Sequence, residues 1–519
     1  MLRIGINIRF AAALLPAWLL TANALAEDAG LARFPTADWA TATPEDEGMD
    51  SAAVERLVSF GARERLDSLA LVRHGRIVLD TYYAPYRADL PHAVNSTTKA
   101  VTGSLIATML KDGVLDSIDH PVVDFFRDRE IANLDARKQA ITVRHLLNMT
   151  SGLEWDEGLG TGPEQSLQEL RRAPDWVKYI LDKPMAHAPG ETFYYNSGNS
   201  HLLSAIISKL TGKTAQDYAN EKLFRPLGIK PPIWLRDPQG LSTGGFGLLL
   251  KPRDMARFGY LYLRGGRWGD QQLLPPDWID AVTHASVDMQ TTFEPGLHYA
   301  NQFWSLPEQQ VFMSVGYHCQ VIMVLPRSDI VAVMTAHDFC PMKKLALDIV
   351  GAVKSDDALA RSPEAFAQLQ KTVRDAAVEK PSAVAVAPAQ AAAVSGRTYS
   401  FAESQLRFKT ITLHLDDAPP HVSWDIYDPA SPNGVLRLDS PIGLDGLYRI
   451  NAPKTLAVPF SYRAMKGAWT DQRTFVVDLQ YLTQGVNTKW TLAFGDDQMT
   501  ITAKARDGRA VTITSEKRQ

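Results

Sequence analysis

The chain has little of what marks several common protein classes. Only two of its 519 residues are cysteines, so at most one disulfide can form within the chain. Its 54 Lys and Arg residues nearly balance 58 Asp and Glu residues, and no block of like charge interrupts the sequence. A net charge of −4 gives no electrostatic basis for binding nucleic acid or an anionic membrane. Internal repeats are also lacking, and its length predicts two to four domains.

Residues 1–26 are expected to lie outside the fold. Arg3 and Arg9 form a basic region, Phe10–Leu20 is apolar, and Ala24-Leu25-Ala26 has the small-residue spacing of a cleavage site. This order predicts a signal peptide, and hence a periplasmic or secreted protein. A membrane anchor is the alternative, but the apolar run is short and no charged stop follows it. No stable membrane span is therefore expected.

A candidate nucleophile lies in the segment Pro91–Ala100. The apolar spacing that follows predicts a loop leading into a helix that ends near Lys111. Ser96-Thr97-Thr98-Lys99 is the only Ser-x-x-Lys in the chain, and residues three apart are neighbours on one helix face. A hydroxyl and an amine would thus meet at the positive end of the helix, as nucleophilic catalysis requires. The alternative is an N-capping Ser with a solvated Lys.

A second candidate is the segment Tyr194-Tyr195-Asn196, which follows a Pro-Gly loop and precedes a predicted helix near Ser200–Leu210. Tyr-x-Asn also occurs at Tyr218 and Tyr299, which we place in a helix and near a strand. We favour Tyr194, because a loop presents its side chains rather than packing them.

The composition changes near the C-terminus. Residues 378–395 are mostly Ala, Val and Pro, which is typical of a linker, and separate a domain at 27–377 from one at 396–519. Turn signals between short alternating runs predict that the second domain is an all-β sandwich or barrel.

Together these motifs resemble the serine β-lactamase and penicillin-binding-protein superfamily, and most closely its class C-like branch of esterases, D-aminopeptidases and 6-aminohexanoate-dimer hydrolase. The resemblance covers about residues 45–355. It rests on Ser96–Lys99, on Tyr194–Asn196 and on a wider context: His145-Leu146-Leu147, Thr150–Leu153, Pro189-Gly190, Pro226-Leu227-Gly228 and Arg253–Gly259. It implies an α/β (α+β) fold, with a mixed antiparallel sheet flanked by helices and a helical lobe.

The third motif of the superfamily, Lys-Thr-Gly or His-Thr-Gly, is absent as such. Gly316-Tyr317-His318-Cys319-Gln320 takes its place, in a form similar to that of non-lactamase members. The resemblance implies a substrate-binding role here, with His318 facing the substrate and the Tyr317 backbone N–H helping to bind the oxyanion. Recognition of a β-lactam carboxylate is not expected from this segment.

The implied mechanism is hydrolysis of an ester or amide through an acyl-serine. Ser96 would attack the carbonyl, Lys99 and Tyr194 would exchange its proton, and Asn196 would bind Lys99 or the substrate amide. Which of Lys99 and Tyr194 is the base is left open. A small acyl compound is the expected partner, and no cofactor is expected. The alternatives are a β-lactamase or D,D-peptidase, and a non-catalytic binding protein on the same scaffold.

The two cysteines admit two interpretations. A zinc site could use Cys319 and Cys340 with His318 and His337, but adjacent residues on a strand point to opposite faces. We therefore expect no metal there and predict a disulfide between Cys319 and Cys340, as is common in exported proteins. We also expect no nucleophile elbow of the α/β-hydrolase type.

Overall fold

The computed structural model describes residues 34–35, 38–157, 164–290, 295–338, 341–428, 431, 433–451, 453, 462–505 and 508–517. The expected signal peptide and Cys340 lie outside the described residues. No helix within the described ranges is both long and apolar enough to span a bilayer.

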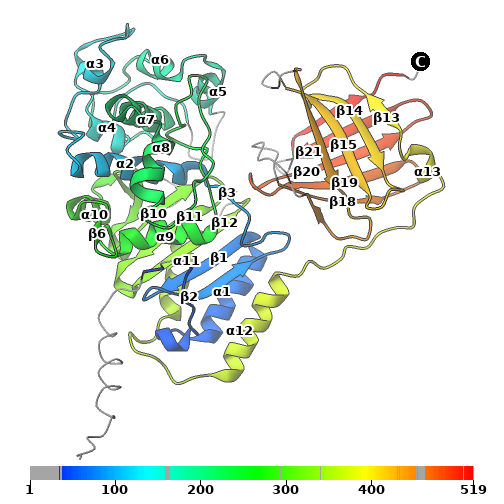
Figure 1. Ribbon diagram of the computed structural model, residues 1–519, viewed down its shortest axis with the longest axis horizontal. Coiled ribbons are helices and arrows are strands. Elements are labelled where there is room, and N and C mark those ends of the chain that lie inside the picture. The colour runs from blue at the N-terminus through cyan, green and yellow to red at the C-terminus, as the bar shows by residue number, and fades with distance from the viewer. Residues whose placement is uncertain are drawn as a thin grey trace, which may run out of the picture.

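The first domain is built on an eight-stranded antiparallel sheet in the order β2-β1-β12-β11-β10-β9-β8-β7 (Figure 1). Its strands are β1 (Leu66–Arg73), β2 (Arg76–Tyr82), β7 (Val287–Asp288), β8 (His298–Ala300), β9 (Phe303–Leu306), β10 (Val311–Gly316), β11 (Gln320–Leu325) and β12 (Ile330–Ala336). The predicted hairpins around Gly75 and around residues 326–329 are both present, because β1 pairs with β2 and β11 with β12.

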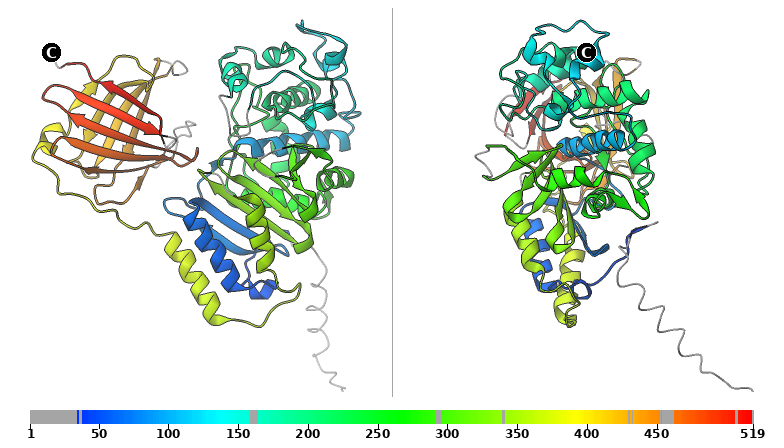
Figure 2. Two further views of the ribbon diagram at one scale, coloured as in Figure 1. Left: turned by 180° about the vertical axis from the view of Figure 1, so that it is seen from behind. Right: turned by 90° about the vertical axis from the view of Figure 1, so that its left-hand side faces the viewer.

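Helices cover both faces of this sheet and form a lobe above it (Figures 1 and 2). Helices α1 (Ser51–Arg63), α11 (Met342–Ala352) and α12 (Pro363–Ala376) cover one face, and α9 (Pro252–Leu263) packs on the other. The remaining helices of the first domain are α2 (Thr98–Lys111), α3 (Ala136–Gln139), α4 (Val143–Leu147), α5 (Gln165–Arg172), α6 (Trp176–Leu181), α7 (Ser197–Thr211), α8 (Ala215–Ala219) and α10 (Pro276–Thr283).

Two-stranded ladders join β3 (His92–Ala93) to β4 (Leu249–Leu250), and β5 (Arg267–Trp268) to β6 (Gln271–Gln272). The implied fold class is confirmed.

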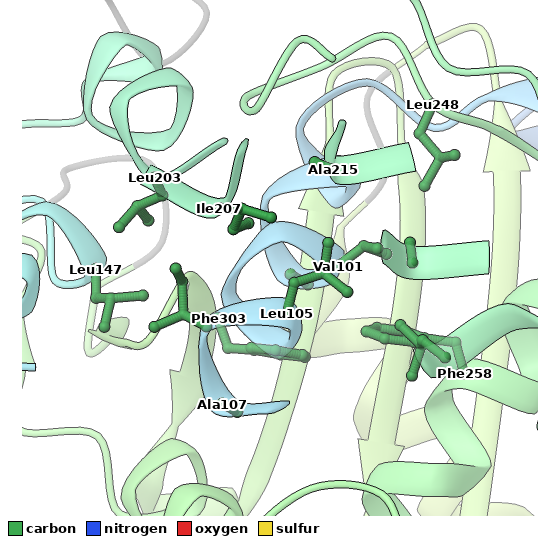
Figure 3. Close-up of a cluster of buried hydrophobic side chains, with 14 of the residues drawn as sticks. Val101, Leu105, Ala107, Leu147, Leu203, Ile207, Ala215, Leu248, Phe258 and Phe303 are labelled. Atoms are coloured by element: carbon green, nitrogen blue, oxygen red, sulfur yellow. The ribbon is translucent and has the colours of Figure 1, made fainter. Parts of the chain in front are cut away.

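Helix α2 is buried almost all round. Its residues from Thr98 to Met109 are shielded from solvent, and Val101 and Leu105 lie among side chains of α7, α9 and β9 (Figure 3). A helix that is buried on every face belongs to the core of a large domain. The nucleophile candidate therefore stands at the end of a rigid element.

The second domain consists of two antiparallel sheets around one apolar core. One sheet has the order β13-β14-β15-β16 and the other β17-β18-β19-β20-β21-β22. The strands are β13 (Thr398–Ser400), β14 (Phe408–His414), β15 (His421–Tyr427), β16 (Val435–Pro441), β17 (Arg449–Ile450), β18 (Arg463–Trp469), β19 (Thr474–Tyr481), β20 (Val486–Phe494), β21 (Met499–Ala505) and β22 (Ala510–Thr514). An all-β second domain is thus present.

The predicted linker is shorter than its composition indicated. A short helix, α13 (Gln390–Val394), contributes Ala391 and Val394 to the core of the β-domain. Earlier in the linker, Glu379 pairs with Lys466 at 3.0 Å. Alanine-rich sequence favours a linker and a helix alike, so composition could not mark this boundary.

The two domains also meet near the start of β3. Tyr86 and Leu90 of the first domain form a buried cluster with Ala464 and Leu482 of the second. Beside it, the Ala93 backbone N–H donates to the Thr483 carbonyl at 2.6 Å. The β-domain is therefore docked on the segment that leads to Ser96.

This contact predicts that the two domains remain together after the linker between them is cut. Limited proteolysis between residues 378 and 388 should give two fragments that co-elute in size-exclusion chromatography. Leu482→Asp should separate them, because it places a charge in a fully buried cluster. Val486→Asp is the matched control, since Val486 is 43% exposed at the start of β20. Separation of the wild-type fragments would contradict the interface.

Candidate active site

The Ser96 and Lys99 side chains meet as their spacing predicts. A short 3-10 turn over Asn95–Thr97 leads into α2, and the Lys99 ammonium donates to Ser96 Oγ at 3.0 Å. Lys99 is 1% exposed, whereas Ser96 is only partly buried. This excludes the alternative of a solvated lysine, and places a partly buried hydroxyl next to a buried amine.

Two further oxygen atoms hold the Lys99 ammonium. Ser197 Oγ accepts at 2.8 Å and the Gly245 carbonyl at 2.9 Å. The loop carrying Gly245 can approach α7 only because Gly244 has no side chain, since a Cβ there would lie 1.9 Å from the Ser200 carbonyl oxygen. Three segments far apart in the sequence thus converge on one amine.

Burial lowers the pKa of Lys99 from its usual 10.5 to about 8, and the negative charges of Glu157 and Glu164 act in the opposite direction. The amine is therefore held close to the pH at which it can both accept and release a proton.

The aromatic neighbour of this amine is Tyr195, not Tyr194. The Lys99 ammonium lies 4.6 Å from the centre of the Tyr195 ring, and the Tyr195 side chain hydrogen-bonds with Ser96. Tyr194, by contrast, is 42% exposed. Burial, with the charge of Glu157, raises the pKa of Tyr195, while the hydrogen bond with Ser96 lowers it. The contacts foreseen for Tyr194 are thus made by its neighbour.

Asn196 is not the residue that contacts Lys99, which was one of the two partners predicted for it. Its side chain caps α7 by accepting from the Asn199 backbone N–H at 3.1 Å. Ser197, one residue later, is the group that contacts Lys99. The motif of this chain is therefore Tyr195-Asn196-Ser197. The preference of Asn for helix N-caps is the signal that could have revealed this shift.

Glu157 is a site residue that no sequence motif identified. This buried carboxylate accepts from the Ser197 hydroxyl at 2.6 Å, from the Ser197 backbone N–H at 2.7 Å and from Trp155 Nε1 at 2.8 Å. The Ser197 hydroxyl accepts from the Lys99 ammonium and donates to the Glu157 carboxylate, so it links the two groups by a chain of hydrogen bonds.

The third motif forms a tight turn between β10 and β11 rather than a strand. His318 and Cys319 both have φ near +60°. The turn lies against the nucleophile segment, because Asn95 Nδ2 donates to the Tyr317 carbonyl at 2.9 Å and Thr97 Oγ1 to the Gln320 carbonyl at 2.7 Å. The rings of Tyr317, which is 53% exposed, and His318 are 3.9 Å apart. An aromatic pair therefore stands beside Ser96.

The zinc alternative does not fit this turn. Cys319 is disulfide-bonded, as predicted, and Cys340 lies outside the described residues. His337 Nδ1 pairs with the buried carboxylate of Asp67 at 2.7 Å. The adjacent-residue argument about strand faces does not apply here, since His318 and Cys319 lie in a turn.

A second serine has the spacing of a nucleophile elbow, contrary to our expectation. Gly240-Leu241-Ser242-Thr243-Gly244 matches Gly-x-Ser-x-Gly. Ser242 is fully buried, however, and its hydroxyl accepts from the Gln216 backbone N–H at 3.0 Å. Its surroundings make it a structural residue.

The fold and the geometry around Lys99 define a serine hydrolase of the lactamase-like type. The comparison with family models agrees, because the Beta-lactamase model matches residues 52–352. The chain therefore belongs to the beta-lactamase family, and it is a hydrolase of that superfamily.

Individual relatives are distant. The chain is 22% identical over 286 residues to a 6-aminohexanoate-dimer hydrolase of Paenarthrobacter ureafaciens, which covers 51% of this chain and 71% of that protein. It is 28% identical over 163 residues to the monacolin J acid methylbutanoyltransferase of Aspergillus terreus, covering 28% and 38% of the two chains. With the esterase EstB of Burkholderia gladioli it shares 24% identity, covering 37% and 53%. The chain thus covers about half the length of the esterase and a smaller share of the length of the transferase.

Among solved structures, a family VIII carboxylesterase superposes with a TM-score of 0.46 at 14% identity, covering 65% of this chain and 98% of that one.

Replacing Glu157 tests the electrostatic link to Lys99. Because the Glu157 charge raises the pKa of Lys99, Glu157→Gln should lower that pKa below about 8. The rate at which a fluorophosphonate labels Ser96 should then rise with pH at a lower midpoint than in the wild type. Glu154→Gln is the control, since Glu154 is an exposed acid on the same segment. An unchanged or higher midpoint in Glu157→Gln would contradict the link.

Proposed function

We propose that this protein hydrolyses an ester or amide of a small acyl substrate through an acyl-serine intermediate on Ser96. The observation that carries the proposal is the buried Lys99 ammonium, which contacts Ser96 Oγ directly and has its pKa lowered to about 8. A serine hydroxyl is a weak nucleophile unless a base lies within hydrogen-bond reach. A non-catalytic binding protein would have no need to bury a lysine beside a serine, at the cost of desolvating its charge.

The directions of the two pKa shifts assign the roles. With a pKa of about 8, roughly one Lys99 in ten is neutral at neutral pH and can accept the Ser96 proton. Tyr195 stays a phenol, because burial raises its pKa. We therefore assign Lys99 as the base and Tyr195 as the group that passes a proton to the leaving group.

The complete cycle balances with water alone. Ser96 Oγ forms a bond to the carbonyl carbon while its proton moves to Lys99. The tetrahedral intermediate then expels the alcohol or amine, which leaves with a proton delivered through Tyr195. Water next attacks the acyl-serine, loses a proton to the same network, and releases the acid and free Ser96. The backbone N–H groups of Ser96 and Tyr317 are the proposed donors to the oxyanion.

The proposal also includes export. Residues 1–26 have the order of a signal peptide, and a disulfide at Cys319 is typical of an oxidising compartment.

Two adjacent tyrosines provide the sharpest test of the site. Ser96→Ala should abolish hydrolysis of a p-nitrophenyl ester, and Lys99→Ala and Tyr195→Phe should each lower kcat/KM by about 10²–10⁴. Tyr194→Phe, the matched control, should stay within about threefold. Combining Lys99→Ala with Tyr195→Phe should cost little more than either alone, because both serve one proton-transfer network. Equal damage from Tyr194→Phe and Tyr195→Phe would refute the assignment.

Substrate preference separates the esterase or amidase reading from the β-lactamase or D,D-peptidase alternative. The turn beside Ser96 presents the Tyr317 and His318 rings where lactamases carry a cationic Lys-Thr-Gly. We expect short esters and small amides to be cleaved faster than penicillins, by at least about tenfold in kcat/KM. The measurement is steady-state kinetics on purified protein with both substrate classes. Faster turnover of penicillins would favour the alternative.

A further inference from the structure

A second cluster of ligand-type side chains lies on the β-domain, outside the hydrolase domain. His414 ends β14 and His421 begins β15, and the two are directly paired across the hairpin. Their rings stack with centres 4.1 Å apart and an angle of 10°. Asp417, in the loop between them, completes a group of three residues whose ligand atoms all lie within 4.8 Å of one another.

The Asp417 carboxylate lies beside the Nδ1 atoms of both histidines. Asp417 Oδ2 lies 3.7 Å from His414 Nδ1 and 3.8 Å from His421 Nδ1. These separations are too long for good hydrogen bonds but close to the spacing of ligands that share an ion about 2 Å from each. The Pro419 carbonyl is the other neighbour, 3.4 Å from His421 Nδ1. Because the lone pair of an imidazole nitrogen lies in the plane of the ring, the two stacked rings would have to turn toward Asp417 to enclose an ion.

The outer nitrogen of His414 also has a hydrogen-bond partner, because its Nε2 lies 3.2 Å from Ser423 Oγ. Metal-binding histidines usually engage their second nitrogen in this way, which fixes the orientation of the ring and makes the free nitrogen a better ligand. The bond to Ser423 leaves His414 Nδ1 on the side of Asp417. His421 Nε2 faces the Asp439 carboxylate at 3.8 Å, beyond hydrogen-bond distance.

We propose that His414, Asp417 and His421 bind one divalent transition-metal ion, of which zinc best matches two imidazoles and a carboxylate. Water would complete the coordination, because the Asp417 side chain is 55% exposed. The ion would tie the two strand ends and the loop between them together. It would have no part in the chemistry at Ser96, which lies in the other domain.

The competing account is a simple charge cluster, in which Asp417 attracts whichever histidine is protonated. The two accounts differ in what the cluster binds: the metal site takes up zinc near neutral pH, whereas the charge cluster would bind no zinc.

Zinc titration of the metal-free full chain, followed by calorimetry near neutral pH, decides between these accounts. We expect about one zinc ion per chain and a higher Tm when zinc is present. His421→Phe, which keeps the stacked ring, should lower the affinity at least about tenfold, and Asp417→Asn should do likewise. His284→Phe is the matched control, since His284 is an exposed histidine paired with a single carboxylate, Asp280.

The variants also separate loss of zinc binding from loss of folding. The metal-free His421→Phe protein should keep the wild-type circular dichroism spectrum and ester hydrolysis. If the wild type binds no zinc, or if His284→Phe loses as much affinity as His421→Phe, the proposed site is overturned.

Discussion

The burial of one positive charge is the constraint on which this site depends. An ammonium group removed from water needs oxygen atoms around it, and Lys99 obtains them from Ser96, Ser197 and Gly245. None of the three is itself charged, so they satisfy hydrogen bonds without fully compensating the charge. Desolvation therefore prevails, and the pKa of Lys99 falls. Had Glu157 contacted the amine directly, the two residues would have formed a buried salt bridge. Lys99 would then have kept its proton and been a poor base.

The backbone around Lys99 follows from this requirement. Each oxygen comes from a different segment, and each segment is held by its own local chemistry. Asn196 caps α7 and so presents Ser197 in its first turn. The absence of a side chain at Gly244 lets the next residue, Gly245, turn its carbonyl to the amine. A change at any of these positions should affect Lys99 without touching the substrate.

Sequence reasoning succeeded where periodicity or a unique motif existed. The helix ending at Lys111 and the two hairpins followed from apolar spacing, and Ser96 with Lys99 followed from helix geometry. It failed by one residue at Tyr194, because a loop entering a helix has no period to fix which side chain faces inward. Glu157 could not be found at all, since its link to Lys99 arises only when two loops are brought together.

Domain boundaries show the same limit. Composition marked the start of the linker but not its end, where α13 joins the core of the β-domain. Nor could local sequence indicate that Leu482 buries itself against Tyr86 and Leu90. Long-range contacts between domains depend on surface shape, which leaves little trace in any one segment.

The docking of the β-domain has a further physical consequence. Its contact with the Ala93 backbone lies three residues before the nucleophile, on a segment that continues directly into α2. Beneath it, the buried carboxylate of Asp67 pairs with His337, and Tyr86 stacks on His92 and His337. Because α2 is buried almost all round, the short stretch between Ala93 and Thr98 is what joins the β-domain contact to the core of the first domain. That stretch contains Ser96 and Asn95, which holds the Tyr317 turn. The position of Ser96 relative to the Tyr317 turn therefore depends on a segment that the β-domain contacts directly.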